Sequence, residues 1–126
     1  WPIKIEKPMI NALKSIPFCT VPLKNYAMAT SGNYRQFFFK NGKRYGHTID
    51  PRSGFPARNE MLSVTVLAPS AAEADAYATA FMVLGLKESV EIISKNPFLK
   101  AFIIYEKDEK SVFWASPNLS FELVKE

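Results

Sequence analysis

The chain has 126 residues, of which 48% are apolar, and it carries a formal net charge of +4. This length and apolar content predict one globular domain over residues 1–126 with a single core. No run of about 20 apolar residues is present, so no segment is expected to span a membrane. Cys19 is the single cysteine, which excludes an intrachain disulfide and a cysteine-based zinc site.

Short strands are predicted along most of the chain, because apolar residues alternate or cluster between turn residues. In chain order the predicted strands are 3–7, 27–31, 34–39, 43–47, 61–68, 99–105 and 112–115, with an edge segment at 121–124. Asn41-Gly42 predicts a hairpin turn between the third and fourth of these strands, and residues 106–110 predict another turn. Residues 10–16 predict one or two helical turns, and Pro17 to Pro22 are expected to interrupt regular structure.

Two helices are predicted in the second half of the chain. The first covers residues 70–84, with Ser70 and Glu73 as a capping box and Gly85 as its stop. The second covers residues 87–95 and ends before Pro97. Antiparallel strands with helices segregated on one face predict an α+β fold, an antiparallel sheet with two main helices on one face.

The segment 34–45 interleaves basic and aromatic residues on one predicted hairpin, a pattern that can stack bases and follow phosphates. Strand alternation sends Phe37 and Phe39 to one face, so much of the aromatic set is expected in the core. The positive charge is modest and spread along the chain, which favours solubility. No nucleic-acid partner is therefore predicted, and retention of single-stranded oligonucleotide would favour the alternative.

The sole histidine, His47, stands three residues before Asp50 in a loop that closes on Gly54. Asp-Pro and Ser-Gly are common turn dipeptides, so this loop is either a plain turn or a chemical site. An imidazole with a pKa near neutrality suits a general base, and Asp50 would orient it.

Asp75 and Thr79 are four residues apart in the first predicted helix, so they share one face. A carboxylate and a hydroxyl at this spacing can bind one small hard cation, and a single carboxylate suits magnesium accompanied by water and phosphate oxygens. The alternative is a small-residue face packed on a sheet, with Asp75 at the solvent edge and Thr79 bonded back to a carbonyl of its own helix.

Three segments in this order carry a resemblance to a known family: Ala-Thr-Ser-Gly-Asn-Tyr-Arg at 29–35, His-Thr-Ile-Asp-Pro-Arg-Ser-Gly at 47–54, and Ala-Asp-Ala-Tyr-Ala-Thr-Ala at 74–80. They resemble the carboxy-terminal half of the ApbE family, the FAD:protein FMN transferases, and the match extends from about Trp1 to about Phe113. The fold implied is the carboxy-terminal half of an ApbE-like (T-fold-like) structure.

The resemblance implies a magnesium-dependent enzyme that splits the FAD pyrophosphate, joins FMN to a threonine or serine hydroxyl of an acceptor protein and releases AMP. The acceptors implied are flavoprotein subunits of membrane redox complexes. Asp75 and Thr79 match the metal ligands, and His47 matches the general base, with Asp50 beside it. The positions that match the flavin nucleotide site are Ser31, Gly32, Tyr34, Arg35, His47, Ile49 and Arg52.

Family members are more than twice as long, so the chain is expected to be a fragment that lacks an amino-terminal half and is inactive alone. The resemblance further implies that the parent is exported and membrane-anchored as a lipoprotein on the periplasmic side. A noncatalytic flavin-nucleotide-binding module would share every motif, and it stays open as the alternative function.

Overall fold

The computed structural model describes residues 2–7, 16–22, 25–32, 37–40, 43–46, 49–56, 59–120 and 122–123. Its main element is an antiparallel sheet of four strands in the order β10-β9-β8-β3. The strands are β3 (Ala27–Gly32), β8 (Met61–Ala68), β9 (Lys100–Lys107) and β10 (Lys110–Ala115). Every residue of β8 is buried, because β8 lies between two strands and both faces of the sheet are covered.

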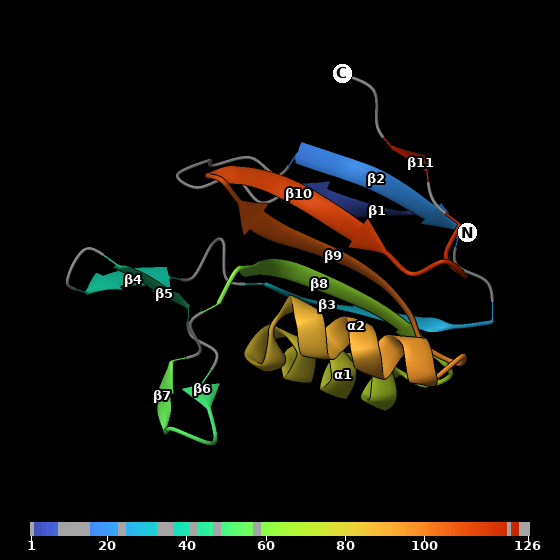
Figure 1. Ribbon diagram of the computed structural model, residues 1–126. Helices are drawn as coiled ribbons and strands as arrows, with labels where there is room; N and C mark the ends of the chain where they lie inside the picture. The colour runs from blue at the N-terminus through green and yellow to red at the C-terminus, as the bar shows by residue number, and fades with distance from the viewer. Residues whose placement is uncertain are drawn as a thin grey trace.

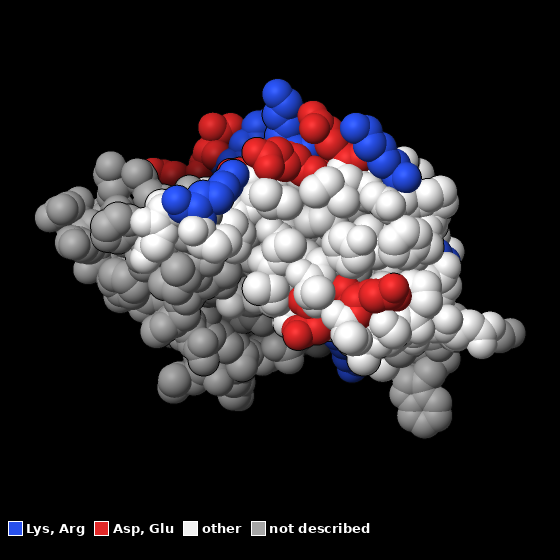
Figure 2. Space-filling view, turned by 90° about the horizontal axis from the view of Figure 1, so that it is seen from below, with Lys and Arg blue, Asp and Glu red and all other residues white. Residues whose placement is uncertain are grey.

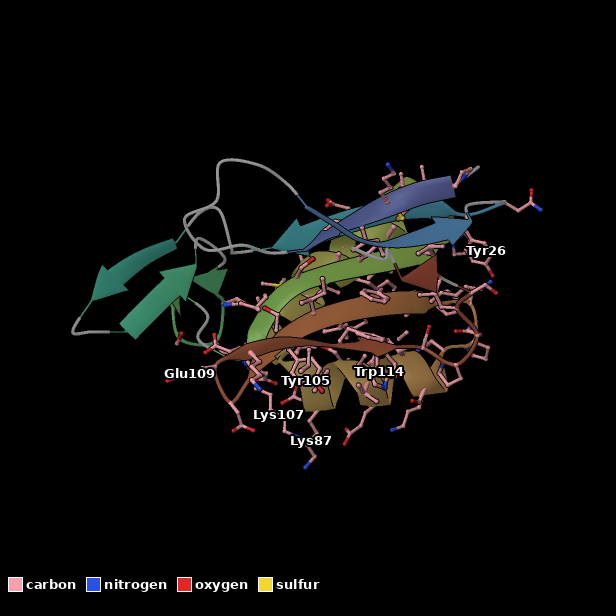
Figure 3. The ribbon with its side chains drawn as sticks, turned by 90° about the horizontal axis from the view of Figure 1, so that it is seen from above. Tyr26, Lys87, Tyr105, Lys107, Glu109 and Trp114 are labelled. Carbon is pink, nitrogen blue, oxygen red and sulfur yellow. The ribbon has the colours of Figure 1, made fainter. Side chains whose placement is uncertain are left out.

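Two helices, α1 (Ala71–Leu84) and α2 (Leu86–Lys95), cover one face of this sheet (Figure 1). Alternate residues of β8 and β9 point toward them, as the two-residue period of a strand requires. The core on this side contains Met61, Val64, Val66, Ala68, Ala74, Ala78, Phe81, Met82, Ile93, Leu99, Ala101 and Ile103. Tyr105 and Trp114 are partly buried against this core, and Figure 3 shows them along the β9–β10 side of the sheet.

The opposite face of the sheet carries a second apolar cluster, formed by Ile5, Leu62, Leu67, Phe102, Ile104 and Leu119. Within it, the Phe102 ring stacks on Phe113 with centroids 5.1 Å apart. Ile5 belongs to a three-stranded antiparallel sheet with the order β1-β2-β11, made of β1 (Pro2–Lys7), β2 (Ile16–Pro22) and β11 (Glu122–Leu123). Helices, a central sheet and a second sheet therefore form successive layers (Figure 1).

The α+β prediction is confirmed by these layers, but the expected break between Pro17 and Pro22 is wrong. These residues form β2, the middle strand of the smaller sheet. Pro17 pairs with Glu6 next to a register shift, and Pro22 is the last residue of the strand. Proline lacks an amide proton, and at a bulge or a strand end it costs the ladder little. The helical turns predicted at residues 10–16 fall on residues 10–15, outside the described residues, while Ile16 opens β2.

The hairpin between β9 and β10 is tighter than predicted. Asp108 and Glu109 form its turn, and both have positive φ, 52° and 63°. Two residues with positive φ match the right-handed twist of the flanking strands, which allows the strands to extend to Lys107 and Lys110. The sequence lacks the Asn-Gly or Asp-Gly pair that usually marks such a turn, so a longer polar turn was expected.

Two smaller hairpins lie beyond the end of the main sheet, on the left of Figure 1. β4 (Phe37–Lys40) pairs with β5 (Lys43–Gly46), as the sequence predicts, although Asn41 and Gly42 lie outside the described residues. β6 (Ile49–Asp50) pairs with β7 (Phe55–Pro56) across residues 51–54. Gly54 has a φ of +76°, consistent with a turn that closes on this glycine.

The junction between α1 and α2 is held by Asn59 and Glu60, which precede β8. The Asn59 side-chain amide donates to the carbonyls of Met82 and Val83, at 2.9 and 3.2 Å. A Glu60 carboxylate oxygen accepts from the Leu86 amide at 2.8 Å. These contacts pair helix-end groups that have no partner within their own helices. The two residues therefore tie both helices to the start of β8.

Replacing Gly85 with alanine is expected to destabilise this junction by about 1–3 kcal/mol. Gly85 has φ 87° and ψ 174°, a backbone conformation that is essentially restricted to glycine. An added Cβ would lie 3.6 Å from the Glu60 carboxylate, an ordinary contact, so backbone strain is the expected cause. Urea unfolding of the two proteins measures the difference, and equal midpoints with equal slopes would contradict it.

No helix among the described residues is both long and apolar enough to cross a membrane.

Candidate functional site

The helix α1 presents Asp75 and Thr79 to solvent. Ser70 caps the helix, since its hydroxyl accepts from the Glu73 amide at 3.2 Å and its carbonyl accepts from the Ala74 amide at 3.0 Å. This cap confirms the predicted helix start. The buried residues Ala74, Ala78, Phe81 and Met82 set which side of α1 faces the sheet, and the helical period then determines where the other side chains point.

Asp75 and Thr79 each follow a fully buried alanine, Ala74 and Ala78. Both are exposed themselves. Consecutive helix residues are separated by about 100° around the axis, so the pair lies along one border of the buried stripe. The spacing places the carboxylate and the hydroxyl one turn apart on one face, as the sequence predicts.

The end of β3 lies next to this border of α1. Residues of β3 alternate between the two faces of the sheet, and Ala29 packs in the core beneath the helices. Ser31 shares that face, and its Oγ lies 3.3 Å from the Thr79 Oγ1. Thr30 points the other way, where its Oγ1 lies 2.9 Å from the Thr65 Oγ1. The fold therefore brings together two predicted site segments separated by 48 residues.

The surface around α1 carries little charge. Figure 2 looks onto the helices and shows a broad uncharged area that contains a small acidic group, with more charged side chains along one edge. The acidic residues of α1 are Glu73 and Asp75, and both are exposed. In α2, Lys87 and Lys95 are exposed; Lys87 is labelled in Figure 3.

The side-chain oxygen atoms of Asp75 and Thr79 are of the kind that binds a hard divalent cation. Asp75 offers a carboxylate, and Thr79 offers a hydroxyl one turn away. Among the described residues, no three or more His, Cys, Asp or Glu side chains gather as a metal site. A single carboxylate with a hydroxyl suits magnesium, which keeps several waters and takes one or two carboxylates with substrate phosphates. This donor set is less suited to calcium, which takes six to eight oxygens.

The other predicted site residues are described to different extents. Gly32 is exposed at the end of β3, and Arg52 is exposed in the 51–54 turn. For Ile49 and Asp50 the structure gives the backbone, which pairs in the β6–β7 hairpin. Tyr34, Arg35 and His47 lie outside the described residues. The same holds for the side chains of the basic and aromatic β4–β5 hairpin, so the nucleic-acid alternative is untested.

The contact between Ser31 and Thr79 was not predicted from the sequence, although a pattern pointed to it. Alternate residues of β3 on the helix side are Ala27, Ala29 and Ser31, all small, and α1 is rich in alanine. Small residues on both elements allow the close approach of a helix to a strand. If the small residues of β3 had been expected to pack against the alanines of α1, the Ser31 hydroxyl would have been placed beside α1.

A comparison with protein-family models matches residues 1–103 to the ApbE family. Among curated proteins, the chain is 40% identical to the "FAD:protein FMN transferase" of Haemophilus influenzae, over 86% of this chain and 31% of that protein. It is 36% identical to the protein of the same name from Escherichia coli K12, over 100% of this chain and 35% of that protein. The chain thus spans about a third of the length of these relatives.

Solved structures show the same similarity. The flavin transferase ApbE from Vibrio cholerae matches with a TM-score of 0.77 and 38% identity, over 93% of this chain and 36% of that chain. The apo form of the Pseudomonas stutzeri flavinyl transferase ApbE matches with a TM-score of 0.75 and 33% identity, over 93% and 35%. These matches confirm the α+β fold class and its likeness to ApbE structures.

Proposed function

We propose that this chain, which belongs to the ApbE family, is part of an FAD:protein FMN transferase. The observation that supports this proposal is the cluster of Asp75, Thr79 and Ser31 where α1 meets the end of β3. The curated relatives that bear the transferase name and are compared above are 40% and 36% identical to the chain. The chain spans about a third of their length, and we propose that the remaining part of the site comes from outside this sequence.

The proposed reaction transfers FMN from FAD to a threonine or serine hydroxyl of an acceptor flavoprotein. The hydroxyl oxygen attacks the phosphorus of the FMN half of the pyrophosphate, and a new phosphoester bond forms. The bond from this phosphorus to the bridging oxygen breaks, and AMP leaves. Such a transfer needs the reactants in line, charge stabilisation on the phosphates, and removal of the hydroxyl proton.

We propose that Asp75 and Thr79 hold magnesium at this site. When bound, the ion supplies positive charge that stabilises the negative charge developing on the phosphate oxygens. The position of the two residues on a capped helix limits how far they can move, which suits a role in orienting a ligand.

The remaining roles follow from the chemistry of the side chains. His47 takes the proton from the acceptor hydroxyl, and Asp50 orients its imidazole. Arg35 and Arg52 donate planar pairs of hydrogen bonds to phosphate oxygens. Gly32, Tyr34 and the segment around Ile49 border the flavin nucleotide. Subunits of membrane redox complexes are the acceptors we propose, with the parent protein anchored to the membrane as an exported lipoprotein.

Mass spectrometry of an acceptor protein tests the proposal. The protein that carries this chain within its full length is expected to add the mass of FMN to a threonine-bearing acceptor, in the presence of FAD and Mg²⁺, and to release AMP. The 126-residue chain alone is expected to give little or no transfer, because it spans about a third of the relatives' length.

Two results would count against these expectations. If the full-length protein binds FAD but leaves the acceptor unmodified, the transferase assignment fails. If the isolated chain transfers FMN efficiently, then these 126 residues hold a complete site, and the proposal that the rest of the site lies outside them is wrong.

A further inference from the structure

The Ser31 hydroxyl is placed by the fold beside a proposed metal ligand. Ser31 lies near the end of β3 on the face that α1 covers, and its Oγ lies 3.3 Å from the Thr79 Oγ1. The side chain is half-buried. Ala29, two residues earlier on the same face, is packed in the core beneath the helices. Facing α1, β3 therefore has a hydroxyl group at Ser31 and only a methyl group at Ala29.

A threonine hydroxyl in a helix has two common orientations, because it can bond back to a carbonyl three or four residues earlier. The contact with Ser31 favours an orientation in which the hydroxyl of Thr79 points toward β3. A hydroxyl has one proton and two lone pairs. When a lone pair ligates a cation, the proton needs a separate acceptor, and such outer partners orient a ligand and tune its affinity.

We propose that Ser31 is a positioning residue that accepts a hydrogen bond from the Thr79 hydroxyl and directs a lone pair of that hydroxyl toward magnesium. This inference rests on the proposed function, in which Asp75 and Thr79 hold the ion. It assigns Ser31 a different task from the flavin-nucleotide contact that the family resemblance implies, because Ser31 acts through Thr79.

The neighbouring residue supplies a matched control. Thr30 also forms a hydroxyl-to-hydroxyl contact, with Thr65 at 2.9 Å, but on the opposite face of the sheet. The Thr30→Val change removes a hydroxyl from the same strand, one residue away, on the side that faces away from α1. Any general effect of weakening β3 should appear in both Ser31→Ala and Thr30→Val.

The experiment measures the dissociation constant of Mg²⁺ alone by titration calorimetry, using the full-length protein that carries this chain. Ser31→Ala is expected to weaken Mg²⁺ binding about 2- to 10-fold, the usual worth of one hydrogen bond. Thr30→Val is expected to leave it unchanged. Adding Ser31→Ala to Thr79→Val is expected to cause no further loss, because the residue through which Ser31 acts has already lost its hydroxyl. FAD affinity without Mg²⁺ is expected to be the same in Ser31→Ala and the parent.

Three results would overturn the positioning role. The first is unchanged Mg²⁺ affinity in Ser31→Ala, and the second is a loss of Mg²⁺ affinity from Ser31→Ala that is as large in Thr79→Val as in the parent. The third is weaker FAD binding by Ser31→Ala in the absence of Mg²⁺. The last would instead indicate direct contact with the nucleotide. If Asp75→Asn and Thr79→Val both leave Mg²⁺ binding unchanged, the proposed metal site itself fails and the inference falls with it. Measuring the four single variants and the double variant therefore separates failure of the positioning role from failure of the proposed function.

Discussion

Asp75→Asn is expected to reduce FMN transfer about a hundredfold to a thousandfold, because it removes the carboxylate charge from the proposed magnesium site. Stabilisation of phosphate charge by a bound metal is worth several kcal/mol, and about 1.4 kcal/mol corresponds to a factor of ten in rate. Asparagine has nearly the same size as aspartate and keeps one oxygen ligand. The expected loss therefore reflects charge rather than shape.

Because Asp75 is exposed, the substitution is expected to change the free energy of unfolding by no more than about 0.5 kcal/mol. The rate of FMN transfer, followed by mass spectrometry over a range of Mg²⁺ concentrations, measures the effect. Higher Mg²⁺ is expected to recover part of the lost rate, since one oxygen of the side chain and the Thr79 hydroxyl remain.

Glu73→Gln is the matched control. Glu73 is also acidic and exposed in α1, but it lies two residues away, so its side chain points in another direction around the helix. The change removes the same charge from the same helix and is expected to alter the rate less than about twofold, the size of a weak surface effect. Equal losses in both variants would indicate a general effect of surface charge and contradict a metal site at Asp75.

His47→Ala is expected to lower FMN transfer about 100- to 10,000-fold and to leave FAD bound. A positioned general base usually contributes this much to a proton transfer. His47 is the sole histidine of the sequence, so no other imidazole of this chain can replace it. Single-turnover transfer and FAD affinity, measured on the same full-length variant, separate loss of chemistry from loss of binding.

Added imidazole provides a control for this substitution. A small base that enters the space left by the side chain is expected to restore part of the rate in His47→Ala and to have little effect on the parent. A parent protein with no measurable transfer would favour the noncatalytic flavin-binding module. Full activity in His47→Ala would exclude the histidine as the base while leaving the transferase assignment in place.

The sequence predicted the elements whose signals are local. The capping residue Ser70, the stop at Gly85 and the largely apolar stretch of β8 together predicted β8 and α1 almost to the residue. The spacing of Asp75 and Thr79 likewise predicted their common face, because the helical period is fixed. The motifs at 29–35, 47–54 and 74–80 predicted the ApbE family, whose model matches residues 1–103.

Local rules failed where a longer-range contact decided the structure. Pro17 and Pro22 looked like breaks, yet β2 tolerates them because one pairs beside a bulge and the other ends the strand. That outcome depends on pairing with β1 and β11, which residues near the prolines do not indicate. The β9–β10 turn was also predicted too long, because cross-strand pairing extends both strands up to two residues with positive φ.

The sequence by itself determined the helix start, the residue types of the site and their order along the chain. Which of these residues meet was decided only by the tertiary structure. Ser31 and Thr79 are 48 residues apart in the sequence. They are in contact because β3 pairs with β8 while α1 packs across both strands. The physical reason is that capping and periodicity act within a few residues, whereas the partner of a side chain is set by how strands pair and layers pack.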